Sequence, residues 1–327
     1  MARLTYVSRS RGAHDERFVA ALRHGGHRVA VAGLDEVTPE GADLIVAGPL
    51  TDATPAAVAT GAPVLGIAWG FDVLVEARDP ALRDRAAAAV TACAGVHVDC
   101  EALRREVVAL GADPAGVSIA PWGIDTDFFT PGPAPEGLRE RHGLGPDDVV
   151  VLSTRSWEEL YAVPLVIEGV ARARDADPRL RLVLAGEGSL ADTIRDQIDT
   201  RGLAPVTVTP GRLDPAGVRD WLRAADVYVG AATSDGTSLS LLEALACGVP
   251  AVVPDLGGNP EWVDGVVAGR TYPPGDAGAL AAALTAVAGS GAGGATERRA
   301  EVLARGHWPT NRRLFLDAVD RALAVAR

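Results

Sequence analysis

Lysine is absent from this sequence of 327 residues, and asparagine occurs only at positions 259 and 311. All 31 basic residues are therefore arginines; they are outnumbered by 43 acidic residues, so the formal net charge is −12. Proteins that bind nucleic acid or anionic membranes usually carry a basic excess. Because neither half of this chain has one, we expect no nucleic-acid partner and no stable membrane association.

Cysteines and aromatic residues are also few. Cys93, Cys100 and Cys247 form no C-x-x-C pair and have no histidine at zinc-finger spacing, which predicts structural thiols in a reducing compartment. The N-terminal residues lack the apolar run of a signal peptide, and glycines interrupt the uncharged stretch 277–296, so we expect no membrane span. These absences favour a soluble, cytoplasmic protein whose cores are built from Ala, Val and Leu.

Short apolar runs alternate with segments of helical period along the whole chain. Runs of Val, Leu, Ile and Ala that alternate with helices are typical of parallel sheets covered on both faces. The sequence therefore predicts an α/β protein with eleven strands: Leu4–Val7, Arg28–Ala32, Leu44–Ala47, Val64–Ala68, Gly95–Val98, Val117–Ala120, Val149–Ser153, Leu180–Ala185, Val206–Thr209, Ala225–Val229 and Val249–Pro254.

One segment interrupts this alternation. Residues 121–147 are rich in proline and glycine, which is a linker composition. It predicts a first doubly wound domain over 1–147 and a second over 148–307, facing each other across a cleft that holds the ligand. In the last segment, 308–327, six residues share one helical face, so we expect a helix that packs back toward the first domain: Phe315, Ala318, Val319, Ala322, Leu323 and Ala326.

The stretch from Ser234 to Pro250 carries the most chemistry. A buried strand is followed by a loop of small residues, and a helix opens near Thr237 or Ser238. Free backbone N–H groups and the helix dipole at such a start can bind a diphosphate. Asp235 in the loop could bind sugar hydroxyls, and Glu243, eight residues later, could bind ribose hydroxyls. Alternatively, Asp235 is a simple loop acid and Glu243 a solvated helix residue.

This stretch resembles the E-x7-E segment of glycosyltransferase family 4, the retaining enzymes of the GT-B fold. Arg155, directly after a strand, matches the donor-phosphate arginine of that family, and Gly186-Glu187-Gly188 matches its glycine turn. Pro121-Trp122-Gly123-Ile124-Asp125 is similar to the segment that links the two domains, and Gly25-Gly26-His27-Arg28-Val29 to the run that ends the first helix. The resemblance implies two facing Rossmann-like domains, with the donor on the second and the acceptor on the first.

The activity that the resemblance implies is transfer of a sugar from a UDP- or GDP-linked donor to a hydroxyl of a small-molecule or glycan acceptor. It further implies retention of configuration. Because no D-x-D motif stands in a plausible metal-binding loop, we expect no metal and no other cofactor, and we expect a monomer or homodimer. The candidate catalytic residues are Arg155, Asp235 and His14. The candidate donor-binding residues are Gly186, Gly188, Arg212, Gly236, Thr237, Ser238, Leu239, Ser240 and Glu243, and the candidate acceptor-binding residues are Asp15, Trp69, Asp72 and Trp122.

Three positions depart from the family pattern. Asp235 stands in place of the first glutamate, and Leu160 and Tyr161 stand where the family has a lysine. Trp69-Gly70-Phe71-Asp72 stands in place of H-G-x-D, so the family histidine is missing. His14 is the candidate substitute, and Arg9, Arg11 and Arg17 could bind a phosphate on the acceptor side.

Other functions fit the same fold. A nucleotide-sugar epimerase, a phosphorylase, or a nucleotide-sugar binding protein without turnover remain alternatives, because a fold alone does not fix a function. A dinucleotide dehydrogenase fits poorly, since no G-x-G-x-x-G follows the first strand.

Overall fold

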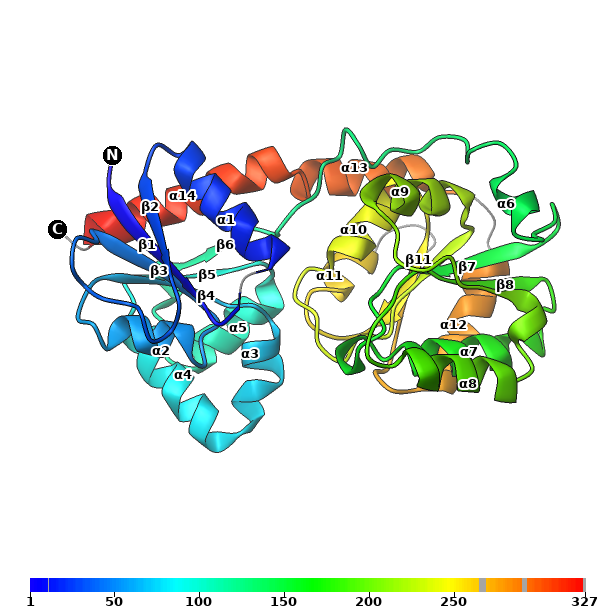
Figure 1. Ribbon diagram of the computed structural model, residues 1–327, viewed down its shortest axis with the longest axis horizontal. Coiled ribbons are helices and arrows are strands. Elements are labelled where there is room, and N and C mark those ends of the chain that lie inside the picture. Colours follow the sequence, from blue (N-terminus) through cyan, green and yellow to red (C-terminus); the bar gives the residue numbers. More distant parts are fainter. Residues whose placement is uncertain (11, 265–268, 290–292, 326–327) are drawn as a thin grey trace. The chain divides into compact units, whose positions relative to one another are not determined.

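The computed structural model describes residues 1–10, 12–264, 269–289 and 293–325. The chain divides into two compact units (Figure 1). The first consists of Met1–Trp122 together with Trp308–Arg327, and the second consists of Gly123–His307. Each unit is built on its own six-stranded sheet, and every strand pair in the two sheets is parallel.

The sheet of the first unit has the order β2-β1-β3-β4-β5-β6. Its strands are β1 (Arg3–Ser8), β2 (Arg28–Ala32), β3 (Leu44–Gly48), β4 (Val64–Ile67), β5 (Gly95–Val98) and β6 (Val117–Ile119). The helices α1 (Ala13–His24) and α14 (Trp308–Val325) lie on one face, and α2 (Ala53–Val58), α4 (Pro80–Ala92) and α5 (Glu101–Ala109) lie on the other (Figure 1). The strand order reverses between β1 and β3, which makes the carboxyl ends of these strands a topological switch point.

The last helix of the chain, α14, packs on the first unit. Phe315, Ala318, Val319 and Ala322 are almost completely buried, as expected for the apolar stripe of a helix that lies on a sheet. α14 contacts β4, β5, β6 and α1. Ala326 belongs to the predicted stripe but lies outside the described residues.

The sheet of the second unit has the order β12-β11-β10-β7-β8-β9. Its strands are β7 (Val149–Ser153), β8 (Leu180–Leu184), β9 (Thr207–Val208), β10 (Val227–Val229), β11 (Ala251–Pro254) and β12 (Arg270–Tyr272). Its helices are α6 (Leu138–Arg141), α7 (Val163–Arg174), α8 (Ala191–Thr200), α9 (Pro215–Ala224), α10 (Leu239–Ala246), α11 (Pro260–Val263), α12 (Ala277–Gly289) and α13 (Ala295–Arg305). Here the switch point lies between β7 and β10.

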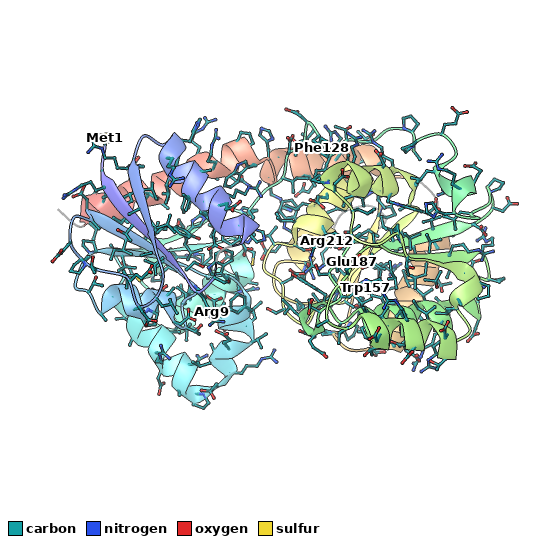
Figure 2. The ribbon with its side chains drawn as sticks, viewed as in Figure 1. Met1, Arg9, Phe128, Trp157, Glu187 and Arg212 are labelled. Carbon is teal, nitrogen blue, oxygen red and sulfur yellow. The ribbon has the colours of Figure 1, made fainter. Side chains whose placement is uncertain are left out.

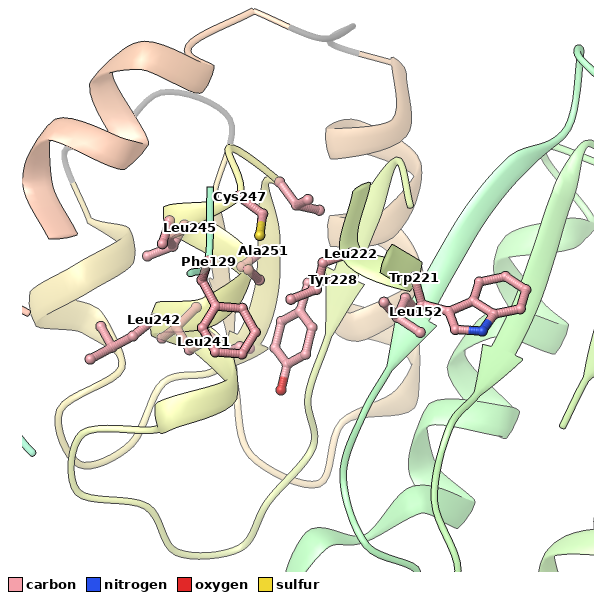
Figure 3. Close-up of a cluster of buried hydrophobic side chains, with 14 of the residues drawn as sticks. Phe129, Leu152, Trp221, Leu222, Tyr228, Leu241, Leu242, Leu245, Cys247 and Ala251 are labelled. Carbon is pink, nitrogen blue, oxygen red and sulfur yellow. The ribbon is translucent and has the colours of Figure 1, made fainter. Parts of the chain in front are cut away.

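Two hydrophobic clusters, one on each face, hold the second sheet between its helices. One cluster joins α7, α8 and α12 to the sheet, and the other joins α9, α10 and α13 to it. Figure 3 shows part of the second cluster, in which the ring of Tyr228 lies among leucines of β7, α9 and α10. The hydroxyl of Tyr228 points to the side opposite Cys247 (Figure 3), toward the carboxyl ends of the strands. Since α10 is buried along most of its length, its position relative to β10 is fixed by packing.

The predicted α/β fold and all eleven predicted strands are confirmed, with small shifts at their ends. The twelfth strand, β12, is not predicted, because it has three residues and begins with an exposed arginine. The predicted first domain includes 123–147, whereas these residues pack on the second unit. Ile124, Phe129 and Leu144 are buried in its core, and Arg299 donates to the carbonyl oxygens of Thr126 and Phe129. Composition marks a linker but does not show which core its apolar residues will join.

From the sequence we expect no membrane span. Across the described ranges, no helix combines the length and the apolar character needed to cross a bilayer. Within the stretch 277–296, residues 277–289 form α12 and residues 295 and 296 begin α13. Residues 290–292 lie outside the described ranges.

Candidate functional site

The best-formed polar site of the second unit lies where β7 and β10 end, at the switch point of the sheet. Arg155 follows β7, and Asp235 lies in the loop that joins β10 to α10. The two strands are neighbours in the sheet, so side chains 80 residues apart in the sequence meet at its edge. In open α/β sheets this crevice outside the carboxyl ends of the strands is where ligands bind.

Arg155 binds three side chains of the β10–α10 segment. Its Nη2 lies 2.9 Å and 3.1 Å from the two carboxylate oxygens of Asp235, and its Nη1 lies 2.9 Å from the hydroxyls of Ser238 and Ser240. The side chains of Arg155 and Asp235 are only 11% and 18% exposed. The guanidinium is thus held in one orientation by charged and neutral acceptors together.

The two serines connect Arg155 to the start of α10. Ser238 is the N-cap residue of this helix, and its hydroxyl accepts the N–H of Leu241 at 3.5 Å. Ser240, in the first turn, lies 2.6 Å from the Tyr228 hydroxyl. Because Tyr228 is held in the core, the chain Tyr228–Ser240–Arg155 links the guanidinium to a rigid part of the unit.

The charge of Arg155 is placed at the positive end of a helix. Burial opposes the charged form, but attraction by the Asp235 carboxylate overcomes this, and the pKa of Arg155 is raised above its ordinary value. The ring of Tyr161 lies under the guanidinium, 4.2 Å from ring centre to Cζ, and favours the cation further. Guanidinium and helix N-terminus together form a site suited to a multiply charged anion.

The glycine turn after β8 packs on the loop that carries Arg155. A Cβ at Gly186 would lie 2.5 Å from the Arg155 carbonyl oxygen, and a Cβ at Gly188 would lie 2.4 Å from the Trp157 carbonyl oxygen. No larger residue fits at either position without moving the backbone. The side chain of Glu158 accepts the Ser189 N–H at 3.0 Å and also binds the Ser189 hydroxyl. The turn therefore helps to hold the Arg155 loop in place.

The remaining donor candidates lie at the same edge of the second sheet. Gly236, Thr237 and Leu239 belong to the loop and first turn that carry Ser238. Glu243 is half-buried inside α10, and Arg212 is exposed after β9. Figure 2 labels Trp157, Glu187 and Arg212, which follow β7, β8 and β9 in turn. The structure thus brings Arg155, Asp235, Ser238 and Ser240 into direct contact, whereas Glu243 lies further along α10 and Arg212 in another loop.

In the first unit, the catalytic candidate His14 and the acceptor-binding candidates Trp69 and Trp122 join an aromatic group. The rings of His14 and Trp69 lie 5.8 Å apart, and those of Trp69 and Trp122 also lie 5.8 Å apart, measured between centroids. Phe18 packs edge-on against Trp122 at 4.7 Å. Trp69 Nε1 is buried without a hydrogen-bond partner and lies so close to Gly48 that a Cβ there would be 2.4 Å away.

The two acidic candidates of this unit are occupied by the protein itself. Asp15 accepts the Tyr6 hydroxyl at 3.0 Å and the Gly12 N–H at 2.8 Å, so it caps α1 from inside the first turn. Asp72 has no exposed surface and accepts three backbone N–H groups, those of Leu50, Trp69 and Val73, at 2.8–3.0 Å. Both carboxylates position backbone around the aromatic group.

A charged network lies at the switch point of the first unit. Arg9, after β1, binds both carboxylate oxygens of Glu76 at 2.8 Å and 3.0 Å and also pairs with Asp52, after β3. The hydrogen bonds to Glu76, with smaller contributions from Asp52 and from the charges of both acids, raise the pKa of Arg9 against the effect of burial. Arg17 lies over the Trp308 ring at 4.0 Å, and Arg11 lies outside the described residues. The cation expected to receive a phosphate is therefore already paired with two carboxylates.

Several residues of these sites are not predicted from the sequence. Tyr228 reads as a strand residue, Glu158 and Glu76 as loop acids, and Tyr161 only as a replacement for a lysine. Tyr228 is buried in β10, the strand that leads into the loop of small residues. A tyrosine in that strand is the one signal that could indicate a hydroxyl group next to Ser240.

Comparison with solved structures defines the class of fold. Anabaena HepE in complex with UDP-glucose aligns with a TM-score of 0.80 at 17% identity, over 98% of this chain and 100% of that chain. Sucrose-phosphate synthase from Thermosynechococcus elongatus aligns with a TM-score of 0.81 at 17% identity, over the full length of both chains. At such identities the likeness establishes the fold, which is that of the GT-B glycosyltransferases.

The family comparison is narrower and concerns the second unit. Residues 147–289 match the family model described as Glycosyl transferases group 1, so a resemblance to glycosyltransferases of that group is confirmed there. Among curated relatives, D-inositol 3-phosphate glycosyltransferase 2 of Catenulispora acidiphila is 35% identical over 157 residues, or 45% of this chain and 36% of that protein. The match therefore spans little more than a third of that relative's length.

Proposed function

We propose that this protein transfers a sugar from a nucleoside-diphosphate sugar to an acceptor hydroxyl. The observation that carries the proposal is the position of Arg155. Its guanidinium is fixed at the N-terminus of α10 and at the switch point of a sheet whose residues match group 1 glycosyltransferases. Negative charge grows on the diphosphate as the glycosidic bond breaks, and a preorganised cation stabilises that charge.

The second unit would hold the donor through the groups gathered at its edge. The N–H groups around Ser238 and Ser240 would receive the phosphates, and Glu243, further along α10, would accept the ribose hydroxyls. The HepE structure is a complex with UDP-glucose. In this protein, the groups named above would bind a UDP- or GDP-linked sugar. Retention of configuration at the sugar is part of the proposal and follows from the family resemblance alone.

On the acceptor side we propose a neutral polyhydroxy compound or glycoside. The matched relatives are named for D-inositol 3-phosphate. In this chain Arg9 is paired with Asp52 and Glu76, and the partly buried Trp69 offers an apolar surface, whereas Trp122 is buried. A phosphorylated acceptor would have to compete with those carboxylates, whereas hydroxyl groups could bind to them.

The experiment is a transfer assay with a panel of UDP- and GDP-sugars, and with inositol and inositol 3-phosphate among the acceptors. Arg155→Ala should lower turnover by about 10²–10³ for every donor, as loss of one preorganised stabilising group does. Arg195→Ala removes an exposed arginine of α8 and should leave turnover unchanged. Tight donor binding with no transfer or hydrolysis by the unaltered protein would instead indicate a binding protein.

A further inference from the structure

Asp235 and Arg155 form a shielded ion pair whose charges balance. Both terminal nitrogens of Arg155 are engaged, Nη2 by the two Asp235 oxygens and Nη1 by Ser238 and Ser240. The two side chains are 11% and 18% exposed, so water screens their attraction only weakly.

The aromatic ring beside the pair adds no charge to balance an incoming anion. Tyr161 lies under the guanidinium at 4.2 Å, and Leu160, before it, is apolar. A diphosphate bound beside an intact Arg155–Asp235 pair would bring its negative charges close to the Asp235 carboxylate. Like charges at such short range repel strongly when they are partly removed from water.

We propose that Asp235 is an internal competitor of the ligand: its carboxylate occupies the anion position of Arg155 and is exchanged for the diphosphate when the donor binds. This inference rests on the proposed function and assigns Asp235 a specificity role within it. The Asp235 carboxylate then loses its charged partner and keeps the side-chain hydrogen bond with Ser238, and a hydroxyl group of the donor sugar can donate in place of Arg155. The exchange thus couples binding of the phosphates to recognition of the sugar.

The exchange selects ligands by charge. A nucleoside has no group that can replace a carboxylate on a guanidinium, and it gains nothing from Arg155. A diphosphate brings several charged oxygens, which can satisfy Nη1, Nη2 and the N–H groups at the start of α10 together. Only a ligand with more than one negative charge therefore offsets the free energy needed to release Asp235 from Arg155. That free energy also lowers the affinity for every phosphate ligand.

Asp235→Asn tests the exchange, because asparagine keeps the size of the side chain and removes its charge. Binding of inorganic pyrophosphate, UDP, GDP, uridine and guanosine is measured by calorimetry. The affinity for pyrophosphate, and for whichever of UDP and GDP the protein binds, should rise about tenfold, as expected when two neighbouring charges are coupled. The affinities for uridine and guanosine should stay unchanged. Asp148→Asn is the matched control, since it breaks the ion pair with Arg181 at the amino end of β7 and should change no affinity.

The gain must depend on Arg155. Adding Asp235→Asn to Arg155→Ala should therefore give a smaller gain than Asp235→Asn alone, because only the repulsion between Asp235 and the diphosphate is then removed and no guanidinium is released. Thermal unfolding confirms that each variant folds, and Asp235→Ser takes the place of the asparagine variant if that one does not. An unchanged or weakened pyrophosphate affinity in both Asp235 variants would overturn the inference, and so would failure of pyrophosphate to bind any of the proteins. A pyrophosphate gain without sugar transfer would support the exchange and count against the proposed function.

Discussion

At the scale of single residues, two buried ionisable groups of the first unit respond to acid in opposite directions. His97 is 1% exposed, and its Nδ1 lies 2.9 Å from the Ser118 hydroxyl. Burial, with a smaller contribution from the positive charge of Arg321, lowers the pKa of His97 to about 3. Burial raises the pKa of Asp72 to about 6, against the effect of its three backbone donors. His97 is thus neutral in the fold and takes up a proton when the chain unfolds in mild acid.

The first prediction concerns His97. Below a pH of roughly 6.5, the pKa of histidine in an unfolded chain, His97 binds a proton in the unfolded chain but not in the native state. The free energy of unfolding therefore falls as the pH is lowered toward 3. Between pH 7.5 and pH 5 this should cost about 2 kcal/mol, and His97→Gln should not lose it. Urea unfolding of both proteins at the two pH values measures the difference. Asp72 increases the free energy of unfolding on acidification, but it does so in both proteins, so its contribution cancels in the comparison.

An equal loss of stability on acidification in the two proteins would contradict the buried neutral state of His97. Arg321→Gln provides a further comparison, because it removes a charge that opposes protonation but leaves His97 buried, so the loss of stability between pH 7.5 and pH 5 should stay close to that of the unaltered protein. Its effect should be smaller than that of His97→Gln, since burial is the larger cause.

At the scale of elements, the start of α7 carries local strain. Ala162, the N-cap residue of this helix, has φ 44° and ψ 42°, the left-handed conformation that only glycine adopts at little cost. It is the one residue other than glycine with a positive φ within the described part of the chain. Ala162 directly follows Tyr161, which supports Arg155, and strained residues often accompany functional sites.

Ala162→Gly should therefore stabilise the protein. Relief of the left-handed strain is worth about 1–2 kcal/mol, and the greater freedom of glycine in the unfolded chain takes back about 0.4–1 kcal/mol, so the net gain should be about 0.5–1 kcal/mol. Ala171→Gly, in the interior of the same helix, is the control and should destabilise by about 1 kcal/mol. Urea unfolding compares the three proteins. Destabilisation by both substitutions would show that the conformation at 162 is not strained.

At the scale of the whole molecule, the charge balance limits how a diphosphate can be bound. The chain carries net charge −12 and no lysine, so the positive potential for an anionic donor must come from individual arginines and helix termini. At the edge of the second sheet these are Arg155 and the start of α10. Within the ranges that the structure describes, no three His, Cys, Asp or Glu residues are grouped so as to hold a metal ion.

Nucleotide binding should accordingly persist without a divalent ion. We expect calorimetry with UDP or GDP in EDTA to give the same affinity as in magnesium to within about threefold, because Arg155 and the start of α10 offer positive charge for the diphosphate. Arg155→Ala should weaken binding in both buffers alike. Loss of nucleotide binding on chelation, with recovery on adding magnesium, would show that the donor binds as its metal complex.

The sequence by itself determined the features that depend on local pattern. Apolar runs predicted every strand but β12, and the loop of small residues after β10 predicted a helix that opens near Thr237 or Ser238, where the structure has Ser238 as the N-cap of α10. These follow from periodicity, capping and strand propensity, which act over a few residues. That the carboxyl ends of the strands lie on one side also follows from the parallel α/β order, whereas the strand order that places the switch point comes from the structure.

Only the tertiary structure decided which side chains meet. Arg155 and Asp235 are 80 residues apart, and their pairing depends on the register of β7 beside β10. Trp69, the residue that replaces the expected histidine, packs with Trp122 in an aromatic group, and residues 123–147 join the second core. Burial and side-chain direction arise when distant segments pack, and the same local sequence is compatible with either core or with solvent. For that reason the sequence predicted the candidates, and the fold determined their partners.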